Sequence, residues 1–266
     1  MKMKGIIFYY SGSGNTKLAC EYLIKNIKSA DIELVDIIKN KVGDLGGYDI
    51  VGFATFTDFG SPPRLMEKFI EKLPKQNGKP AVVFNTYGFM SLHTLPVFGA
   101  LVSAKGFKIV NAYSLHTPEN YPPMIKRGKG SEGAPNKMEM QAFDRWISEL
   151  DRTLSKGVEN MESTKLKKPL LSYIIPKFKR TKARKDMGDK FVDEKLCIRC
   201  GICEKGCPYK AVKLAPFPIF DMNKCYGCWS CFNHCPKKAI YTKKFRGKYH
   251  YPKPTKHMIS TLGGRK

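Results

Sequence analysis

The chain has 266 residues, of which 42% are hydrophobic and 26% charged, and its formal net charge is +24. This composition excludes an intrinsically disordered chain and suits one or two globular domains with a packed core. No stretch approaches the roughly 20 apolar residues of a membrane span, and the apolar run near the N-terminus is too short for a signal peptide. We therefore expect a cytoplasmic protein.

Short apolar runs alternate with amphipathic stretches over the first part of the chain. The predicted strands are Gly5–Tyr10, Ile32–Asp36, Ile50–Thr55, Ala81–Thr86 and Phe107–Tyr113. The predicted helices are Thr16–Lys28, Pro62–Leu73, Leu92–Lys105 and Lys137–Leu154. Because such alternation produces a parallel sheet covered on both faces, the sequence predicts an α/β domain with a doubly wound, five-stranded parallel sheet.

The charge is distributed unevenly. Residues 1–160 hold 21 basic and 16 acidic side chains, whereas residues 161–266 hold 26 basic and 7 acidic ones, a net charge of +19. We predict an α/β domain at 1–160, a basic linker at 161–189 and a cysteine-rich domain with a basic tail at 190–266. Because basic side chains flank an apolar island at Leu170–Ile175, docking of the linker on an anionic membrane surface or a partner is an alternative to a plain linker.

A loop rich in hydroxyl groups and glycine joins the first predicted strand to the first predicted helix. Its residues are Ser11, Gly12, Ser13, Gly14, Asn15 and Thr16. The hydroxyls and the N–H groups of the helix start form an anion site without a cationic side chain, and glycines let the backbone close around a phosphate. The loop has neither the lysine of nucleoside triphosphate loops nor the dinucleotide fingerprint. We expect it to bind phosphate, with a plain turn as the alternative.

This loop resembles that of the flavodoxins, in which Gly-Asn-Thr follows the first strand, and the resemblance extends over the α/β domain. The resemblance implies a flavodoxin-like fold and FMN, because no second nucleotide fingerprint is present for FAD. It also implies that two further loops hold the isoalloxazine ring, and their candidate residues are Thr55, Phe56, Thr57, Phe59, Gly60, Thr86, Tyr87, Gly88 and Phe89. Core packing is the alternative for Phe56, Phe59 and Tyr87. The loop His116–Pro123 either closes over the ring edge or is a plain surface loop.

Eight of the nine cysteines form two copies of the pattern C-x2-C-x2-C-x3-C-P. Three thiolates of such a copy wrap one cubane iron–sulfur cluster, while the fourth, before proline, ligates the other cluster. One predicted ligand set is Cys197, Cys200, Cys203 and Cys235, and the other is Cys225, Cys228, Cys231 and Cys207. Two structural zinc sites are the disfavoured alternative. The ninth cysteine, Cys20, is predicted to be a buried apolar residue.

The segment Val192–Thr242 resembles the bacterial two-cluster ferredoxins, which implies a small α+β domain with two [4Fe-4S] clusters. Four bulky residues are predicted to shield the clusters from water: Ile198, Ile202, Tyr226 and Trp229. The whole chain resembles the flavodoxin–ferredoxin fusion proteins of anaerobes. This resemblance implies an electron-transfer flavoprotein.

The expected function is relay of electrons between FMN, which exchanges two, and the clusters, which exchange one each, to a partner redox enzyme. The sequence offers no catalytic triad or general base, so whether the protein is an enzyme is left open. The alternative is an oxidoreductase that reduces a small substrate at FMN with the clusters as its electron supply, and a redox-sensing nucleic-acid-binding protein is less favoured. The positive charge predicts an acidic partner protein, facing Lys177–Lys185 and Lys243–Lys253. Peripheral membrane contact and a homodimer remain open.

Overall fold

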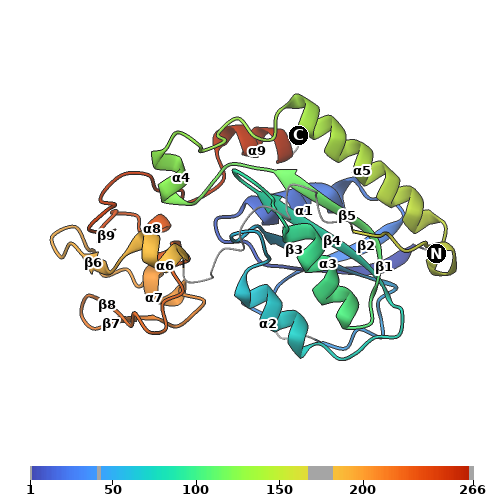
Figure 1. The fold of residues 1–266 in the computed structure, drawn as a ribbon, viewed down its shortest axis with the longest axis horizontal. Coiled ribbons are helices and arrows are strands. Elements are labelled where there is room, and N and C mark those ends of the chain that lie inside the picture. Colours follow the sequence, from blue (N-terminus) through green and yellow to red (C-terminus); the bar gives the residue numbers. More distant parts are fainter. Residues whose placement is uncertain (1, 41–42, 167–181, 264–266) are drawn as a thin grey trace. The chain divides into compact units, whose positions relative to one another are not determined.

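The computed structural model describes residues 2–40, 43–166 and 182–263 (Figure 1). The apolar island Leu170–Ile175 and most of Lys177–Lys185 lie outside the described residues. The chain forms two compact units, and each is assembled from separate segments. The described residues of the first unit are 2–40, 43–118, 131–166 and 255–263, and those of the second are 119–130 and 182–254. No helix among the described residues is long and apolar enough to cross a membrane.

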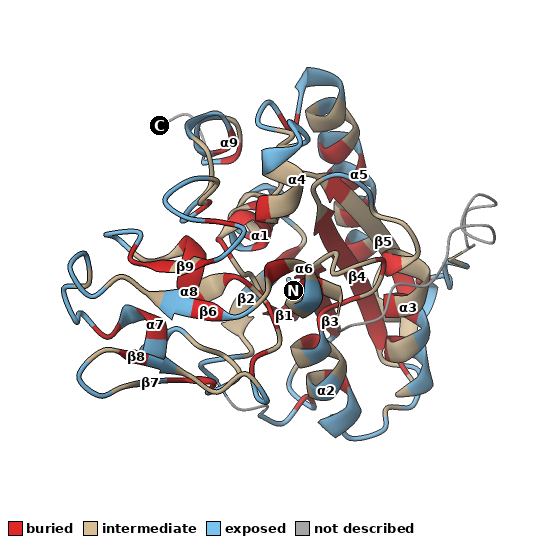
Figure 2. Ribbon diagram, turned by 60° about the vertical axis from the view of Figure 1, so that its left-hand side comes forward, coloured by how far each residue is buried: buried red, intermediate tan, exposed pale blue. Residues whose placement is uncertain are grey.

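The first unit is built on one parallel sheet of five strands, as the sequence predicts. The strands are β1 (Met3–Tyr9), β2 (Ala30–Asp36), β3 (Ile50–Phe56), β4 (Pro80–Tyr87) and β5 (Lys108–His116). Their order in the sheet is β2-β1-β3-β4-β5. Most residues of β1, β3 and β4 are buried (Figure 2), because helices cover both faces of a doubly wound sheet.

The two faces of this sheet carry different helices. One face packs against α1 (Asn15–Asn26), α5 (Lys137–Ser155) and α9 (Lys256–Leu262), and the other against α2 (Arg64–Lys72) and α3 (Thr94–Ala104). Neighbouring strand residues point to opposite faces, so Ile7 packs on the first face and Phe8 on the second. Cys20 is 1% exposed within the first core, as predicted.

The helix α9 corrects the predicted end of the cysteine-rich domain. Instead of forming a basic tail at 255–263, the chain returns to the first unit. Met258 and Leu262 are buried in its core beside α1, and the Thr255 hydroxyl caps the helix by accepting the Met258 N–H at 3.1 Å. A helix with only two buried residues, set among basic side chains, lacks the repeated apolar spacing that reveals a longer amphipathic helix.

The second unit contains short helices and two small sheets. The helices are α4 (Pro122–Lys126), α6 (Lys182–Met187), α7 (Ile202–Lys205) and α8 (Ser230–Asn233), and the strands are β6 (Lys190–Val192), β7 (Val212–Leu214), β8 (Pro218–Phe220) and β9 (Ile240–Thr242). The antiparallel pairs are β6 with β9 and β7 with β8. This α+β arrangement is the one that the sequence predicts after the α/β domain.

Both described ends of the predicted linker 161–189 are packed structure. Met161 is 2% exposed in the core of the first unit, and the Thr164 N–H donates to the Ile109 carbonyl oxygen of β5 at 2.7 Å. At the other end, Met187 of α6 is fully buried in the second unit. The 3-10 turn Val158–Asn160 leads into the first of these segments.

The loop that follows β5 also differs from the prediction. Its residues from Glu119 to Gly130 belong to the second unit, so only the segment to Pro118 stays with the sheet. Within the second unit, the Tyr121 hydroxyl donates to Asp186 Oδ2 at 2.7 Å. The described chain therefore leaves the first unit after Pro118 and is back in it at Ser131.

Candidate functional site

The predicted phosphate loop is a tight connection between β1 and α1. Gly14 has a φ of 98°, and its N–H donates to the Ser11 hydroxyl at 3.1 Å. The helix begins without a side-chain N-cap hydrogen bond. The first N–H groups of an α-helix have no partner within the helix, and an anion at this position accepts them. This geometry fits a phosphate group.

Two buried side chains tie the phosphate loop to neighbouring strands. Asn15 Nδ2 donates to the Pro118 carbonyl oxygen at 2.9 Å, just beyond β5. The hydroxyls of Thr16 and Thr86 share a hydrogen bond of 2.9 Å, and both residues are 1% exposed. The Thr16 hydroxyl therefore joins the phosphate loop to the end of β4, a contact that the sequence did not predict.

The loop after β3 turns sharply at the edge of the sheet. Phe59 and Gly60 have φ values of 51° and 84°, which is the left-handed region that favours glycine. Phe56 lies at 5.3 Å from Tyr10, ring centre to ring centre, and packs against the core. Phe56 is thus partly buried against the core, and its contact with the flavin stays a prediction.

The threonines of this loop are held by neighbouring strands. The buried Thr55 hydroxyl donates to the Tyr10 carbonyl oxygen at 3.3 Å. The Thr57 N–H donates to the Thr86 carbonyl oxygen at 2.8 Å, and the Thr57 hydroxyl accepts from Asn85 Nδ2 at 3.0 Å. The loops after β3 and β4 are therefore fixed to each other.

The loop after β4 places an aromatic ring at the same edge. Tyr87 is half-buried and stacks on His116 with ring centres 5.2 Å apart and an interplanar angle of 17°. Burial raises the pKa of Tyr87, and the charge of Glu139 raises it further. Gly88 follows half-buried, whereas Phe89 is 39% exposed. Tyr87 thus has a defined stacking partner at this edge of the sheet.

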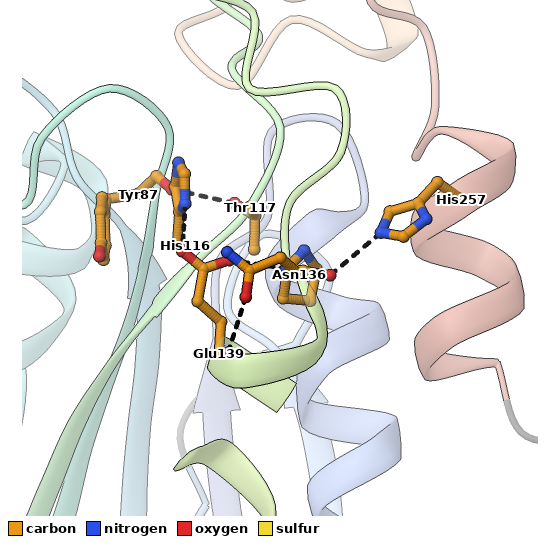
Figure 3. Close-up of polar contacts among 7 residues, drawn as sticks. Tyr87, His116, Thr117, Asn136, Glu139 and His257 are labelled. Carbon is orange, nitrogen blue, oxygen red and sulfur yellow. Dashed lines mark hydrogen bonds and ion pairs between the residues drawn. The ribbon is translucent and has the colours of Figure 1, made fainter. Parts of the chain in front are cut away.

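The residues that support Tyr87 carry no local sequence signal for this contact. His116 Nδ1 lies 2.8 Å from Glu139 Oε1, and Glu139 Oε2 accepts the Asn136 N–H at 2.7 Å (Figure 3). Asn136 and Glu139 form a capping box at the start of α5. The spacing Asn-x-x-Glu before an amphipathic run signals such a box, so the sequence could have indicated the position of Glu139 at the helix start. It could not have indicated the contact of Glu139 with His116.

These loops meet at one edge of the sheet because parallel strands all end on the same side. The register pairs Tyr9 with Ala54, Phe56 with Thr86, and Tyr87 with His116. The order β2-β1-β3 places the reversal of the chain path between β1 and β3. Open α/β sheets bind their ligands beside such a reversal, at the carboxyl ends of the strands.

In the second unit, the four cysteines of one predicted ligand set line a single pocket. They are Cys197, Cys200, Cys203 and Cys235. Burial raises the pKa of Cys203, and the charges of Cys200 and Cys235 raise it further. Apolar side chains complete the lining, among them Ile198, Ile202 and Leu214. The fold therefore brings Cys235, from the second copy of the pattern, to the first three cysteines of the first copy.

The other predicted set is brought together in the same crossed manner. Burial raises the pKa of Cys228 to about 11 and that of Cys231 to about 12, and in both cases the charges of Cys207 and Cys225 contribute. The Lys190 ammonium donates to Cys225 Sγ at 2.7 Å. Burial alone would lower the pKa of Lys190, but the neighbouring cysteine thiols raise it above its ordinary value.

Backbone and aromatic groups surround both sets. The N–H groups of Ala211 and Ala239 donate to Cys207 Sγ and Cys235 Sγ, both at 3.2 Å. Trp229 is 3% exposed, and its Nε1 has no hydrogen-bond partner among the described residues. Tyr226 stacks on Tyr209 with ring centres 4.8 Å apart. Of the predicted shielding residues, Ile198 and Ile202 line the pocket but are 57% and 43% exposed.

The donor groups fit the implied cofactors. Among the described residues, no three His, Cys, Asp or Glu side chains form a group suited to one metal ion. A cubane cluster takes one thiolate at each of four iron corners, and each crossed set offers four thiols. The loop from Ser11 to Thr16 offers hydroxyls and N–H groups, which suit the phosphate of FMN.

Comparisons with known proteins agree with this division. The family model for a flavodoxin domain matches residues 6–93, and the model for a 4Fe-4S dicluster domain matches residues 196–240. An uncharacterized protein of Methanocaldococcus jannaschii is 28% identical over 113 residues, which are 42% of this chain and 73% of that protein.

Several solved structures are also similar to the chain. The two-electron reduced flavodoxin of Megasphaera elsdenii is 23% identical with a TM-score of 0.39, and covers 48% of this chain and 97% of its own. Oxidised flavodoxin 1 of Bacillus cereus is 17% identical with a TM-score of 0.43, covering 56% and 97%. The apo form of an NADH:FMN oxidoreductase is 16% identical with a TM-score of 0.46, covering 61% and 95%.

The two family matches fall on the two compact units. The chain therefore combines a flavodoxin domain with a 4Fe-4S dicluster domain, the combination found in flavodoxin–ferredoxin fusion proteins. Its cofactors are FMN and iron–sulfur clusters, and its role is electron transfer.

Proposed function

We propose that the protein relays electrons between FMN and two [4Fe-4S] clusters and passes them to a partner redox enzyme. The observation that carries the proposal is the presence, in one chain, of a flavodoxin-type edge and two crossed sets of four cysteines. FMN exchanges electrons in pairs, whereas each cluster exchanges one. A chain with one flavin and two clusters thus matches a two-electron system to a one-electron system.

The path of the chain supports transfer within one molecule. Pro118, which accepts the hydrogen bond of Asn15 in the phosphate loop, is separated by two residues from Tyr121. Tyr121 lies edge-on to Trp229, with ring centres 6.0 Å apart, and Trp229 follows the cluster residue Cys228. This short covalent connection between the two units favours exchange of electrons without a second chain.

The residues of the chain hold the cofactors and control access to them. The crossed thiols would hold the clusters, and the buried Trp229 would exclude water beside Cys228. The N–H groups of Ala211 and Ala239 donate to Cys207 Sγ and Cys235 Sγ, the two thiols that each copy contributes to the ligand set of the other. Because these thiols need a reducing compartment, we place the protein in the cytoplasm.

An acidic partner protein suits the charge of the chain. Residues 161–266 have a net charge of +19. In the segment Lys243–Lys253, Arg246 pairs with Asp193, and Lys244 donates to the Asp186 carbonyl oxygen at 3.3 Å. The exposed Lys243 and Lys248 are therefore better candidates for the partner-facing charge.

Rapid-mixing kinetics on the anaerobically purified holoprotein test the relay. We expect a one-electron oxidant added to the fully reduced protein to oxidise the clusters, and the flavin to follow in a phase whose rate is independent of protein concentration. A flavin phase that is second-order in protein would reject transfer within one chain. Steady-state reduction of a small acceptor by the wild-type holoprotein without a partner protein, lost in a Cys207→Ala, Cys235→Ala double variant, would favour the oxidoreductase alternative, in which the clusters supply the electrons to FMN.

A further inference from the structure

The second unit is an internal repeat in which each residue of the first half corresponds to the residue 28 positions later. The correspondence holds for strands and helices as well as for cysteines: β6 begins at Lys190 and β8 at Pro218, and α7 begins at Ile202 and α8 at Ser230. The two halves therefore offer a comparison of the two cluster sites, position by position.

One hydrogen bond to sulfur is equal at the two sites. Cys207 and Cys235 are the cysteines that each half contributes to the ligand set of the other half. Each accepts a backbone N–H at 3.2 Å, from Ala211 and Ala239 respectively. Both donors occupy the same position of the repeat. These hydrogen bonds to sulfur therefore give no reason for the two clusters to differ.

The first position of the first strand in each half breaks this equality. Lys190 opens β6, is only 8% exposed, and donates its ammonium to Cys225 Sγ at 2.7 Å. Its counterpart Pro218 opens β8 and lines the pocket of Cys197. Each strand start thus lies against the cysteines of the opposite half, but one brings a buried positive charge and a donor, and the other brings an apolar ring.

Cations also occur around the pocket of the first ligand set, but they are exposed. Arg199 and Lys237 line this pocket, and the Arg199 guanidinium lies 4.5 Å from the centre of the Phe217 ring. Water and salt screen an exposed charge strongly, whereas a buried charge is screened much less. Lys190 is therefore the electrostatic difference that matters most between the two sites.

We propose that Lys190 raises the reduction potential of the cluster held by Cys225, Cys228, Cys231 and Cys207, and so makes the two clusters inequivalent. Reduction adds one negative charge to a cluster, and a buried ammonium group stabilises that charge. Hydrogen bonds to cluster sulfurs and local net charge are established determinants of such potentials. Burial of Cys225 and Cys231 disfavours the added charge, and Lys190 offsets this effect.

The inference rests on the proposed cofactors, but it needs no partner. Iron and sulfide analysis of the wild-type protein comes first, because absence of iron would refute the proposed function and not the role of Lys190. A redox titration followed by EPR then measures two one-electron steps, and the shifted cysteine signals in proton NMR assign each step to its cluster.

The substitutions Lys190→Met and Lys190→Gln remove the charge, and Lys190→Arg keeps it. For the cluster held by Cys225, Cys228, Cys231 and Cys207, we compare the ratio of its reduced to its oxidised form at one fixed potential. We expect this ratio to fall at least tenfold in both neutral variants, which is a shift of about 59 mV for a one-electron couple. The potential of the first cluster should remain nearly unchanged, and Lys190→Arg should retain most of the wild-type value. Lys237→Met, at the exposed cation of the first pocket, is the matched control and should shift neither step appreciably.

Three results would overturn the proposal. One is an unchanged potential, in the neutral variants, of the cluster that Cys225, Cys228, Cys231 and Cys207 hold. Another is an equal shift of the potentials of both clusters. The third is loss of the cluster that Cys225, Cys228, Cys231 and Cys207 hold from both Lys190→Met and Lys190→Gln. Lys190 would then be required to build the site and not to set its potential.

Discussion

Asn15 and Pro118 are 103 residues apart in sequence, and the side-chain amide of the first donates to the carbonyl oxygen of the second at 2.9 Å. This hydrogen bond fixes the phosphate loop to the chain that leaves β5. The side-chain amide of Asn15 is needed here, because a buried acceptor without a donor costs about 1–3 kcal/mol.

Replacing Asn15 should therefore weaken FMN binding. Asn15→Asp places an acceptor against the Pro118 carbonyl and a negative charge beside the expected phosphate, so we expect the dissociation constant of FMN to rise about ten- to a hundredfold. Quenching of flavin fluorescence during titration of the apoprotein measures this constant. Lys17→Gln, at an exposed position two residues later in α1, is the control and should change the constant little. Unchanged affinity of Asn15→Asp would contradict a phosphate at this loop.

The crossed cysteine sets predict which cluster each substitution damages. In Cys207→Ala, we expect loss of the cluster that Cys225, Cys228 and Cys231 hold, and in Cys235→Ala, loss of the other. Iron content should fall to about half in each, since one of two [4Fe-4S] clusters is lost, and EPR with NMR should identify the remaining one. Cys20→Ala, in the core of the first unit, should retain full iron. If Cys207→Ala instead lost the cluster of Cys197, Cys200 and Cys203, the crossed assignment would be wrong.

Association with an acidic redox partner should depend on salt. Opposite charges accelerate encounter at low ionic strength, and screening becomes strong beyond a Debye length of about 10 Å at 0.1 M salt. We expect the double substitution Lys243→Gln, Lys248→Gln to lower the second-order rate of electron transfer to an acidic ferredoxin and to flatten its dependence on salt. A matched double variant in the first unit, Lys2→Gln with Lys72→Gln, should not. Equal rates for the two double variants would show that Lys243 and Lys248 do not face the partner.

The stability of the FMN-binding unit should depend on α9. Met258 is fully buried in its core, whereas the adjacent Ile259 is 45% exposed. Met258→Ala should therefore cost about 2–5 kcal/mol, and Ile259→Ala about 0.5 kcal/mol or less. Thermal release of FMN, followed by its fluorescence, reports the difference. Equal release temperatures for the two variants would show that α9 does not support this unit.

The sheet was predictable because each of its strands and its four main helices carries a long, regular apolar pattern. Segment ends shifted by only a few residues: the third strand, predicted as Ile50–Thr55, ends at Phe56. The passages of the chain between the two units were not predictable from the sequence. Helix α4, in the segment that joins the second unit, has only five residues, and α9, which packs in the first unit, has only two buried residues. Such short elements are selected by packing and not by local preference.

The candidate sites divide in the same way. The phosphate loop and the ligand cysteines follow from local spacing, which the chain carries in contiguous stretches. Pairings between distant residues do not: nothing in the sequence indicates that Thr16 meets Thr86, or that His116 meets Glu139. Lys190 was also missed, because a lysine in a short strand has no spacing that distinguishes a buried side chain from an exposed one.

The return of α9 to the first unit has a consequence for biosynthesis. A ribosome completes all eight cluster cysteines before it reaches Met258 and Leu262, which fill part of the core beside α1. Segments made early usually fold first during translation, but here the first unit acquires its full core only after the cysteine-rich segment has emerged. The machinery that inserts iron and sulfide can thus reach its cysteines on a nascent chain whose FMN-binding core is still incomplete.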